Sequence, residues 1–255
     1  MKVGEVKIKA PKILIYGDVG AGKTGLLLTA GANAQVLDLD DGLMTGVTLE
    51  DKFTAQRKLV EATTYIEPEP LKKAVVFSQV KAKILALSND MIRGVYPYDL
   101  LGVDSLSSLA DAAVSQIMTN SGKAGQAPEI QHWGLAFLEI KAVLSVIRSM
   151  PIPVVVLAHE QIKSIGQGND RQDKLQIAIA GKNLPGEVAR YFDEVWYLRT
   201  TPGPQNKLIR RIQTATDDKR LARSRFNIPD LTDISCGLWE LIRKCGYVPP
   251  ERKKP

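Results

Sequence analysis

The sequence lacks the features of secreted, membrane-spanning or disulfide-stabilised proteins. Cys236 and Cys245 are its only cysteines. Two are too few for a disulfide framework, and their spacing does not suit a zinc site, so we expect reduced structural thiols. No apolar run approaches the length of a membrane span, and residues 1–5 lack the apolar core of a signal peptide. These absences predict a cytoplasmic protein with no membrane partner.

Internal repeats and obvious domain linkers are also missing. The hydrophobic fraction of 44% and charged fraction of 24% are those of an ordinary globular protein, and 255 residues are enough for a large core. We expect a single domain over residues 1–255, with a core at about 10–230 and a C-terminal extension at 231–255. The net charge of +6 favours an acidic partner such as nucleic acid only weakly, because part of the excess lies at 251–255.

Short apolar runs alternate with helical patterns along the chain. The runs predict strands at 12–16, 35–39, 99–103, 153–158, 194–199 and 207–213, and helical spacing predicts helices at 23–29, 107–118 and 133–150. Residues 74–77 fit either a further strand or part of a helix over 71–88. The alternation predicts an α/β fold whose mostly parallel central sheet carries helices on both faces. Two stretches rich in Gly, Ser, Asn and charge, 120–129 and 163–173, predict mobile loops.

One segment has a clear chemical purpose, and it reads Gly17-Asp18-Val19-Gly20-Ala21-Gly22-Lys23-Thr24. Glycines in this pattern let backbone N–H groups turn inward and form an anion nest at a helix N-terminus. Lys23 places a charge on the β- and γ-phosphates, and the Thr24 hydroxyl ligates Mg²⁺. The segment follows a predicted strand and opens a predicted helix, so a P-loop that binds ATP is favoured over a simple glycine-rich turn.

Two carboxylates follow apolar strands, and they suit the two other roles that ATP hydrolysis needs, a ligand for Mg²⁺ and a catalytic base. Asp104 ends the strand at 99–103, where a P-loop enzyme needs a carboxylate beside Mg²⁺; capping the following helix is the alternative. Asp40 follows the strand at 35–39 and is our candidate catalytic base, the alternative being an acidic turn.

His159 and Glu160 end the most apolar predicted strand. At this position a polar side chain can sense the γ-phosphate and pass its presence to the next loop. A purely structural histidine is the alternative.

Taken in order, these segments resemble the RecA-like ATPases, and in particular short phage recombination proteins such as the Sak-type single-strand annealing proteins. The resemblance covers roughly residues 10–230 and rests on GDVGAGKT, VLDLDDG, LLGVDSLSSL and VVVLAHEQ. Many relatives have Glu where this chain has Asp40. Nothing before residue 10 matches the N-terminal oligomerisation segment of full-length RecA recombinases, so contacts between subunits are expected within the core.

The resemblance also implies partners. Arg223 and Arg225 stand where relatives carry a Lys/Arg pair that reaches the nucleotide of a neighbouring subunit, which implies a ring or filament of identical chains. Their alternate positions also suit a solvated edge strand. The two predicted loops match those that line the DNA channel of relatives, and they would bind single-stranded DNA through the basic residues Lys123, Lys163, Arg171 and Lys174. Ordinary solvated loops are the alternative.

The leading function is therefore ATP hydrolysis coupled to single-stranded DNA in phage recombination or annealing. A regulatory or adaptor ATPase that acts on protein partners remains open. A small-molecule kinase is disfavoured, because no compact Arg-rich lid occurs before residue 200.

Overall fold

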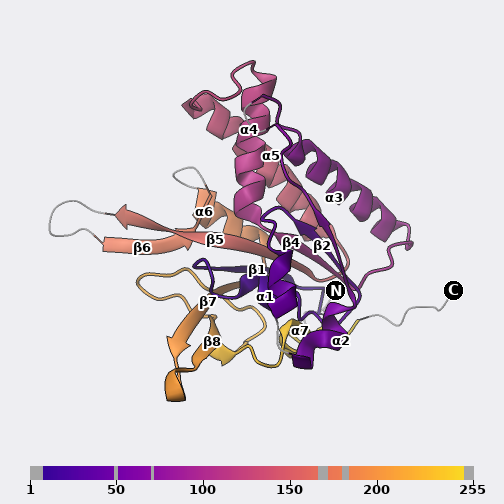
Figure 1. The fold of residues 1–255 in the computed structure, drawn as a ribbon, viewed down its shortest axis with the longest axis vertical. Coiled ribbons are helices and arrows are strands. Elements are labelled where there is room, and N and C mark those ends of the chain that lie inside the picture. Colours follow the sequence, from indigo (N-terminus) through magenta and orange to yellow (C-terminus); the bar gives the residue numbers. More distant parts are fainter. Residues whose placement is uncertain (1–7, 49–50, 70–71, 166–171, 180–183, 250–255) are drawn as a thin grey trace, which may run out of the picture.

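The computed structural model describes residues 8–48, 51–69, 72–165, 172–179 and 184–249. These residues form one extended sheet with helices on both faces (Figure 1). The strands are β1 (Lys12–Gly17), β2 (Ala34–Asp38), β3 (Val60–Thr64), β4 (Leu100–Asp104), β5 (Val154–Ile165), β6 (Gln172–Ile177), β7 (Glu194–Pro202), β8 (Leu208–Gln213) and β9 (Thr232–Asp233). The α-helices are α1 (Lys23–Leu27), α2 (Thr54–Arg57), α3 (Val76–Ile92), α4 (Leu106–Asn120), α5 (Ile130–Ser149), α6 (Leu184–Val188) and α7 (Leu238–Lys244).

The strand order is β3-β2-β4-β5-β1-β7-β8-β9, with β6 paired to β5 outside this row. The row from β3 to β7 is parallel, whereas β8, β9 and β6 pair antiparallel. The fold is therefore the α/β class predicted from the alternating pattern. Its register places Gly17 opposite His159 and Asp38 opposite Asp104, so the candidate site residues meet at the carboxyl ends of the parallel strands.

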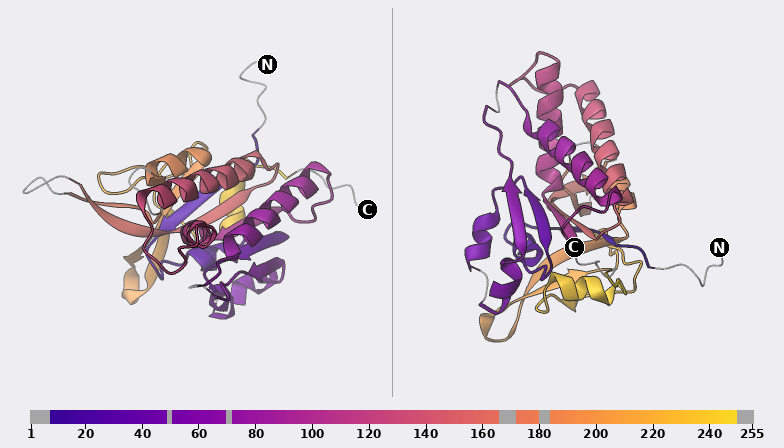
Figure 2. Two further views of the ribbon diagram at one scale, coloured as in Figure 1. Left: turned by 90° about the horizontal axis from the view of Figure 1, so that it is seen from above. Right: turned by 90° about the vertical axis from the view of Figure 1, so that its right-hand side faces the viewer.

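Two apolar clusters hold the layers together. One packs α3, α4 and α5 on one face of the sheet, and the other packs α1 and α7 on the opposite face (Figure 2). Leu238, Leu241 and Ile242 of α7 are fully buried in the second cluster. Residues beyond 230 thus contribute both a strand and core side chains.

Several elements differ from the sequence expectations. Residues 74–77 do not form a strand; Val76 and Phe77 begin α3, which agrees with the helical alternative for this segment. The strand β3 was missed because all but one of its side chains are exposed. The expected loop at 163–173 is wrong at both ends, since β5 continues to Ile165 and β6 begins at Gln172. The polar residues there suit a hairpin that projects from the sheet and is solvated on both faces. The other expected loop, 120–129, does connect two helices.

The helix α5 bears on the expectation that no apolar segment is long enough to span a membrane. Within the described ranges it is the single helix long and apolar enough to cross a membrane by length and composition. Its apolar face is part of the core, where Ala136, Ile140, Leu144 and Ile147 are buried. Burial accounts for only part of its apolar composition, because 33% of the apolar stretch is buried.

Candidate active site

The P-loop lies between β1 and α1, as the motif requires. Gly20 and Gly22 have φ values of +78° and +99°, in the left-handed region that side chains disfavour. Gly22 is also the N-cap of α1, where it provides no side chain. A Cβ at Gly20 would meet nothing within 4 Å, whereas one at Gly22 would meet the side chain of Arg210. Both glycines therefore allow the left-handed backbone of the turn, and Gly22 also leaves room for the Arg210 side chain.

Lys23 lies inside the loop that precedes it. Its Nζ donates to the carbonyl oxygens of Gly17 and Asp18, both at 2.9 Å. Burial lowers the pKa of Lys23, while Asp104 and Glu160 counteract that effect. An ammonium group carries three N–H bonds, so one remains for a phosphate oxygen.

Thr24 and Asp104 form the pair expected to hold Mg²⁺. The Thr24 hydroxyl donates to Oδ2 of Asp104 at 2.6 Å. A Cβ added to Gly42 would lie 3.4 Å from Thr24 Oγ1 and 3.8 Å from Asp104 Oδ2, so the absence of a side chain leaves room above both oxygens. Burial raises the pKa of Asp104 to about 6, with neighbouring carboxylates adding to the effect. A nearby cation would offset this burial cost.

Thr24 and Asp104 could hold Mg²⁺ only together with further ligands from a nucleotide or water. Among the described residues, no group of three or more His, Cys, Asp or Glu side chains could hold a metal alone. Mg²⁺ takes oxygen ligands and commonly shares them with substrate phosphates and water. The helix-capping alternative for Asp104 is not what the structure shows, because Ser105 is the N-cap of α4 and accepts from Ser108 N.

Asp38 and Asp40 have different tasks. Asp38 is fully buried, and its carboxylate accepts from the backbone N–H of Asp40 and Gly42 and from Thr64 Oγ1. It shapes the turn after β2. Asp40 lies beyond that turn and accepts from side chains of two other elements.

The carboxylate of Asp40 is surrounded by donors. Ser105 Oγ donates to it at 3.1 Å, Ser108 Oγ also donates to it, and His159 Nε2 lies 2.8 Å from Oδ2. Burial raises the pKa of Asp40, but the hydrogen bonds with His159, Ser108 and Ser105 outweigh burial and leave the pKa below 3.8. A lowered pKa suits a carboxylate that orients water better than one that removes its proton.

His159 and Glu160 are consecutive residues of β5, and the His159 side chain contacts Asp40. The backbone N–H of His159 donates to Ser107 Oγ at 2.9 Å, which ties the strand to the first turn of α4. Glu160 contributes to the electrostatic environment of Lys23. Its Oε2 is buried and has no hydrogen-bond partner among the residues that the structure describes. Such an atom is costly unless a ligand or water satisfies it.

The sequence reasoning missed the serines of α4 and Arg210 of β8. Arg210 Nε donates to the carbonyl oxygen of Ala21 at 3.1 Å, and a Cβ at Gly22 would lie 2.8 Å from that nitrogen. No sequence signal links β8 to the P-loop, because the two are 189 residues apart. The run Asp-Ser-Leu-Ser-Ser after β4 did carry a signal for the serines.

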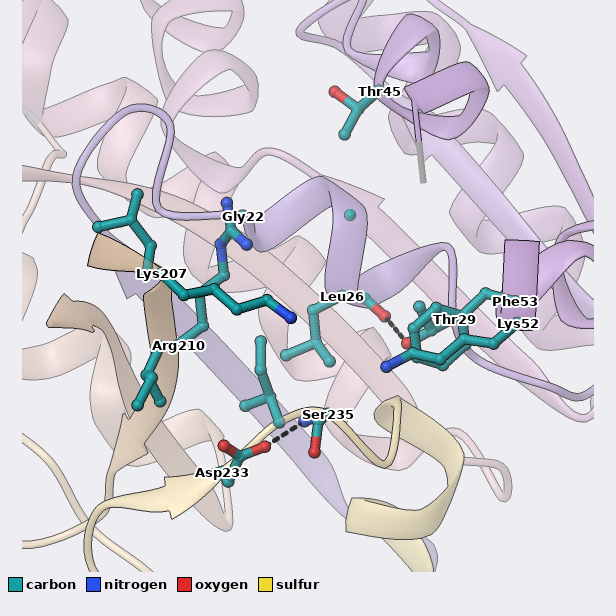
Figure 3. Close-up of a pocket in the computed structure, with 14 residues that line it drawn as sticks. Gly22, Leu26, Thr29, Thr45, Lys52, Phe53, Lys207, Arg210, Asp233 and Ser235 are labelled. Atoms are coloured by element: carbon teal, nitrogen blue, oxygen red, sulfur yellow. Dashed lines mark hydrogen bonds between the residues drawn. The ribbon is translucent and has the colours of Figure 1, made fainter. Parts of the chain in front are cut away.

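A pocket of about 460 Å³ adjoins the P-loop at Gly22 (Figure 3). Gly25, Leu26 and Thr29 of the P-loop helix and its continuation form one wall. Other walls come from β8, from β9 with the residues after it, and from the segment around Phe53. The volume lies within the range of small-molecule sites.

Arg223 and Arg225 do not lie on an edge strand, which corrects that alternative. Arg223 forms an isolated bridge with Val195, and its guanidinium donates to the carbonyls of Ala189 and Phe192. Arg225 pairs with Asp193 at 3.0 Å, and its side chain is half exposed. Ser224 Oγ and the backbone N–H groups of Arg225 and Phe226 all donate to the buried Glu194, which fixes this segment.

Both arginines lie away from their own P-loop. Asp193 accepts from the backbone N–H of Lys12, at the amino end of β1, whereas the P-loop begins at Gly17. A strand of this length separates the two places by roughly 17 Å. The role of these arginines at a neighbouring subunit stays a prediction.

Of the three described residues predicted to contact DNA, two lie together and Lys123 lies apart. Lys163 and Lys174 face each other across β5 and β6 on the projecting hairpin. The segment that joins α4 and α5 lies at the far end of the helical layer (Figure 1). In this segment Lys123 pairs with Glu129 at 2.5 Å. Arg171 lies outside the described residues.

The assembled groups suit phosphoryl transfer to water. ATP would supply the reactive phosphoryl group, and Mg²⁺ would neutralise its charge. In such a reaction, backbone N–H groups and Lys23 would hold the phosphates, Thr24 and Asp104 would hold the cation, and Asp40 would position water.

Comparisons with known proteins agree with this geometry. Residues 9–226 match the model of a family described as an AAA domain. No curated protein is similar enough to count as a match.

Among solved structures, the chain is similar to a prototypical ATPase from the type III secretion system of pathogenic bacteria, with 17% identity and a TM-score of 0.47. That match covers 75% of this chain and 51% of the secretion-system ATPase, so this chain spans about half the length of that protein. The flagellar accessory protein FlaH from Methanocaldococcus jannaschii is similar at 10% identity and a TM-score of 0.41, over 80% of this chain and 77% of FlaH. Because the matched segment spans most of the chain, including the P-loop, the strand ends and most of the sheet, this chain belongs to the AAA domain family.

Proposed function

We propose that this ATPase hydrolyses ATP with Mg²⁺ and uses the reaction to act on single-stranded DNA, in recombination or strand annealing of the phage type. The observation that carries the proposal is the continuity of β5. This strand holds His159 against Asp40 in the site and continues without interruption to Lys163 on the projecting hairpin. A change at the phosphates therefore has a direct path to the hairpin.

The charges on the hairpin suit an anionic partner. Lys163 and Lys174 are directly opposite, so their side chains lie on the same face of the two-stranded ribbon. Two positive charges on one face of the ribbon suit an anionic polymer such as a phosphate backbone. Arg171 in the same segment adds to the proposed DNA contact, while Lys123, which is paired with Glu129, would make a separate contact.

The test is charge reversal on the hairpin. Lys163→Glu with Lys174→Glu should weaken binding to single-stranded DNA of any sequence, and it should flatten the salt dependence by roughly 0.7 for each phosphate that the variant no longer neutralises. Arg148→Glu with Lys244→Glu is the matched control, since both residues are exposed, lie on other elements and change the net charge equally. An unchanged salt slope in the hairpin variant would show that DNA does not run along β5 and β6.

Exposed apolar side chains favour the second candidate, an adaptor ATPase acting on protein partners. Ile162 on the hairpin is 69% exposed, and Leu135 and Leu138 on α5 are 50% and 61% exposed. ATPase rates with and without single-stranded DNA separate the two functions. Stimulation supports the DNA function, and indifference supports the protein-directed one.

The pocket beside the P-loop is the proposed place of the nucleoside. Thr24 and Asp104 face the end of the site that holds Asp40, whereas Gly22, Gly25 and Leu26 line the pocket. A nucleotide whose terminal phosphate lies near Asp40 would therefore extend its ribose and base into this pocket.

We further propose that identical chains assemble into a ring or filament with nucleotide at the interfaces, where Arg223 and Arg225 of one chain act on the next. An arginine finger is worth about 10³–10⁵ in rate. Because Arg223 also holds backbone carbonyls, Arg225→Ala is the cleaner variant. Arg225→Ala and Lys23→Ala proteins should each be inactive alone and recover activity when mixed. Normal hydrolysis by Arg225→Ala alone would remove Arg225 from this role.

A further inference from the structure

We propose that Arg210 binds the phosphate of ATP that is joined to the ribose, within its own subunit, while it holds the P-loop in place. The inference rests on the proposed position of the nucleoside in the pocket at Gly22. It names a residue that acts in the same chain, in contrast to Arg223 and Arg225.

The contacts of Arg210 leave most of its guanidinium available. A guanidinium has five N–H donors, and here Nε donates to the Ala21 carbonyl. The Nη groups form no ion pair or hydrogen bond with the described part of the chain. A cation tied to a phosphate loop by one donor, with the other donors uncommitted, is suited to a phosphate oxygen.

Gly22 allows this approach. A Cβ there would lie 2.8 Å from Arg210 Nε and 2.9 Å from Cδ, closer than side-chain contacts permit. The guanidinium therefore lies against the loop backbone at the mouth of the pocket, as Figure 3 shows. Any ligand that extends from the P-loop into the pocket passes this point.

The charge of the pocket supports an anionic group at its mouth. Lys52, Lys207 and Arg210 line it, against the single carboxylate of Asp233. In Figure 3 the two lysines extend into the pocket from opposite walls, while the Arg210 guanidinium lies at Gly22. Arg210 is thus the pocket cation that touches the P-loop, and the phosphate nearest to the pocket is the one that carries the ribose.

The order of groups along the site identifies that phosphate. Asp40 and the Thr24–Asp104 pair lie toward β2 and β4, where the terminal phosphate would be hydrolysed. The pocket lies along α1, between the segment around Phe53 and the strands β8 and β9, and Arg210 belongs to its β8 wall. The chain of phosphates therefore runs from Asp40 to Arg210, and the group at Arg210 is present in both ADP and ATP.

The test is isothermal titration calorimetry with ADP and with the non-hydrolysable ATP analogue AMP-PNP, both with Mg²⁺. Arg210→Ala and Arg210→Gln should each weaken both ligands by the same factor, on the order of 10- to 100-fold. Arg210→Lys should recover part of the loss. Arg211→Ala, the neighbour on β8 that does not line the pocket, should bind within about 3-fold of the wild type.

The glutamine variant decides between phosphate binding and a merely structural role. Its amide can still donate to the Ala21 carbonyl but carries no charge, so wild-type affinity in Arg210→Gln would overturn the proposal. A loss confined to AMP-PNP would also overturn it, because it would place Arg210 at the terminal phosphate. Lys23→Ala in the same titrations tests the P-loop: if Lys23→Ala loses binding and the Arg210 variants do not, this inference alone fails.

Discussion

Replacing Asp40 with asparagine tests the catalytic assignment of the site most directly. The side chain keeps its shape, but it loses its charge, and one accepting oxygen becomes a donor. In the wild type that carboxylate accepts from Ser105 and Ser108 and contacts His159 at 2.8 Å. Burial raises the pKa of this carboxyl, but the hydrogen bonds with His159, Ser108 and Ser105 outweigh burial and lower it from its usual value, so they favour the ionised form.

The expected loss follows from these contacts. A hydrogen bond to a charged group is worth about 1.5–3 kcal/mol, and a positioned acid or base contributes about 10²–10⁴ in rate. We therefore expect kcat for ATP hydrolysis to fall at least 100-fold in Asp40→Asn. Affinity for ATP should stay within about 3-fold, since Lys23, Thr24 and Asp104 have no hydrogen bond to Asp40.

The assay is steady-state phosphate release together with nucleotide titration of the same protein. Asp41→Asn is the matched control, because Asp41 is exposed and its left-handed φ of +53° is one that asparagine adopts readily. A kcat within about 3-fold of the wild type for a folded Asp40→Asn protein would refute the reasoning. Glu160, with its unpaired buried Oε2, would then be the next candidate.

Three further predictions concern the P-loop, the core and the pH dependence of stability. Lys23→Ala should abolish ATP turnover with little change in melting temperature, because its Nζ contacts only the loop that it serves; normal turnover would contradict the P-loop assignment. Gly102→Ala should lower the free energy of unfolding by about 1–3 kcal/mol in urea titrations, since a Cβ there would lie 2.9 Å from Leu27 Cδ1 and 3.1 Å from Val36 Cγ2, and unchanged stability would show that α1 gives way. Burial lowers the pKa of Lys12 from 10.5 to about 8, so the unfolded chain binds that proton more tightly. Between pH 8 and 10.5 the free energy of unfolding of the wild type should therefore rise by about 3 kcal/mol relative to Lys12→Met, at 1.36 kcal/mol per pKa unit, and a flat difference would contradict the burial effect.

The sequence by itself determined the parts of this protein whose chemistry is local. The P-loop is recognisable because its contacts are short in sequence: Lys23 bonds to carbonyls only five and six residues away. The parallel core strands are recognisable because β1, β2 and β4 are buried along their whole length. In contrast, β3 carried no signal, since an exposed edge strand has little apolar pattern.

Only the tertiary structure decided which of the polar residues work together. Asp40 meets Ser105 and His159 across 65 and 119 residues, and Arg210 meets the P-loop across 189. Asp38 and Asp40 look alike in sequence, yet one turns inward to hold the backbone and the other faces the site. The order of strands in the sheet sets these distances, and local propensity does not encode that order, because it depends on which buried faces pack together.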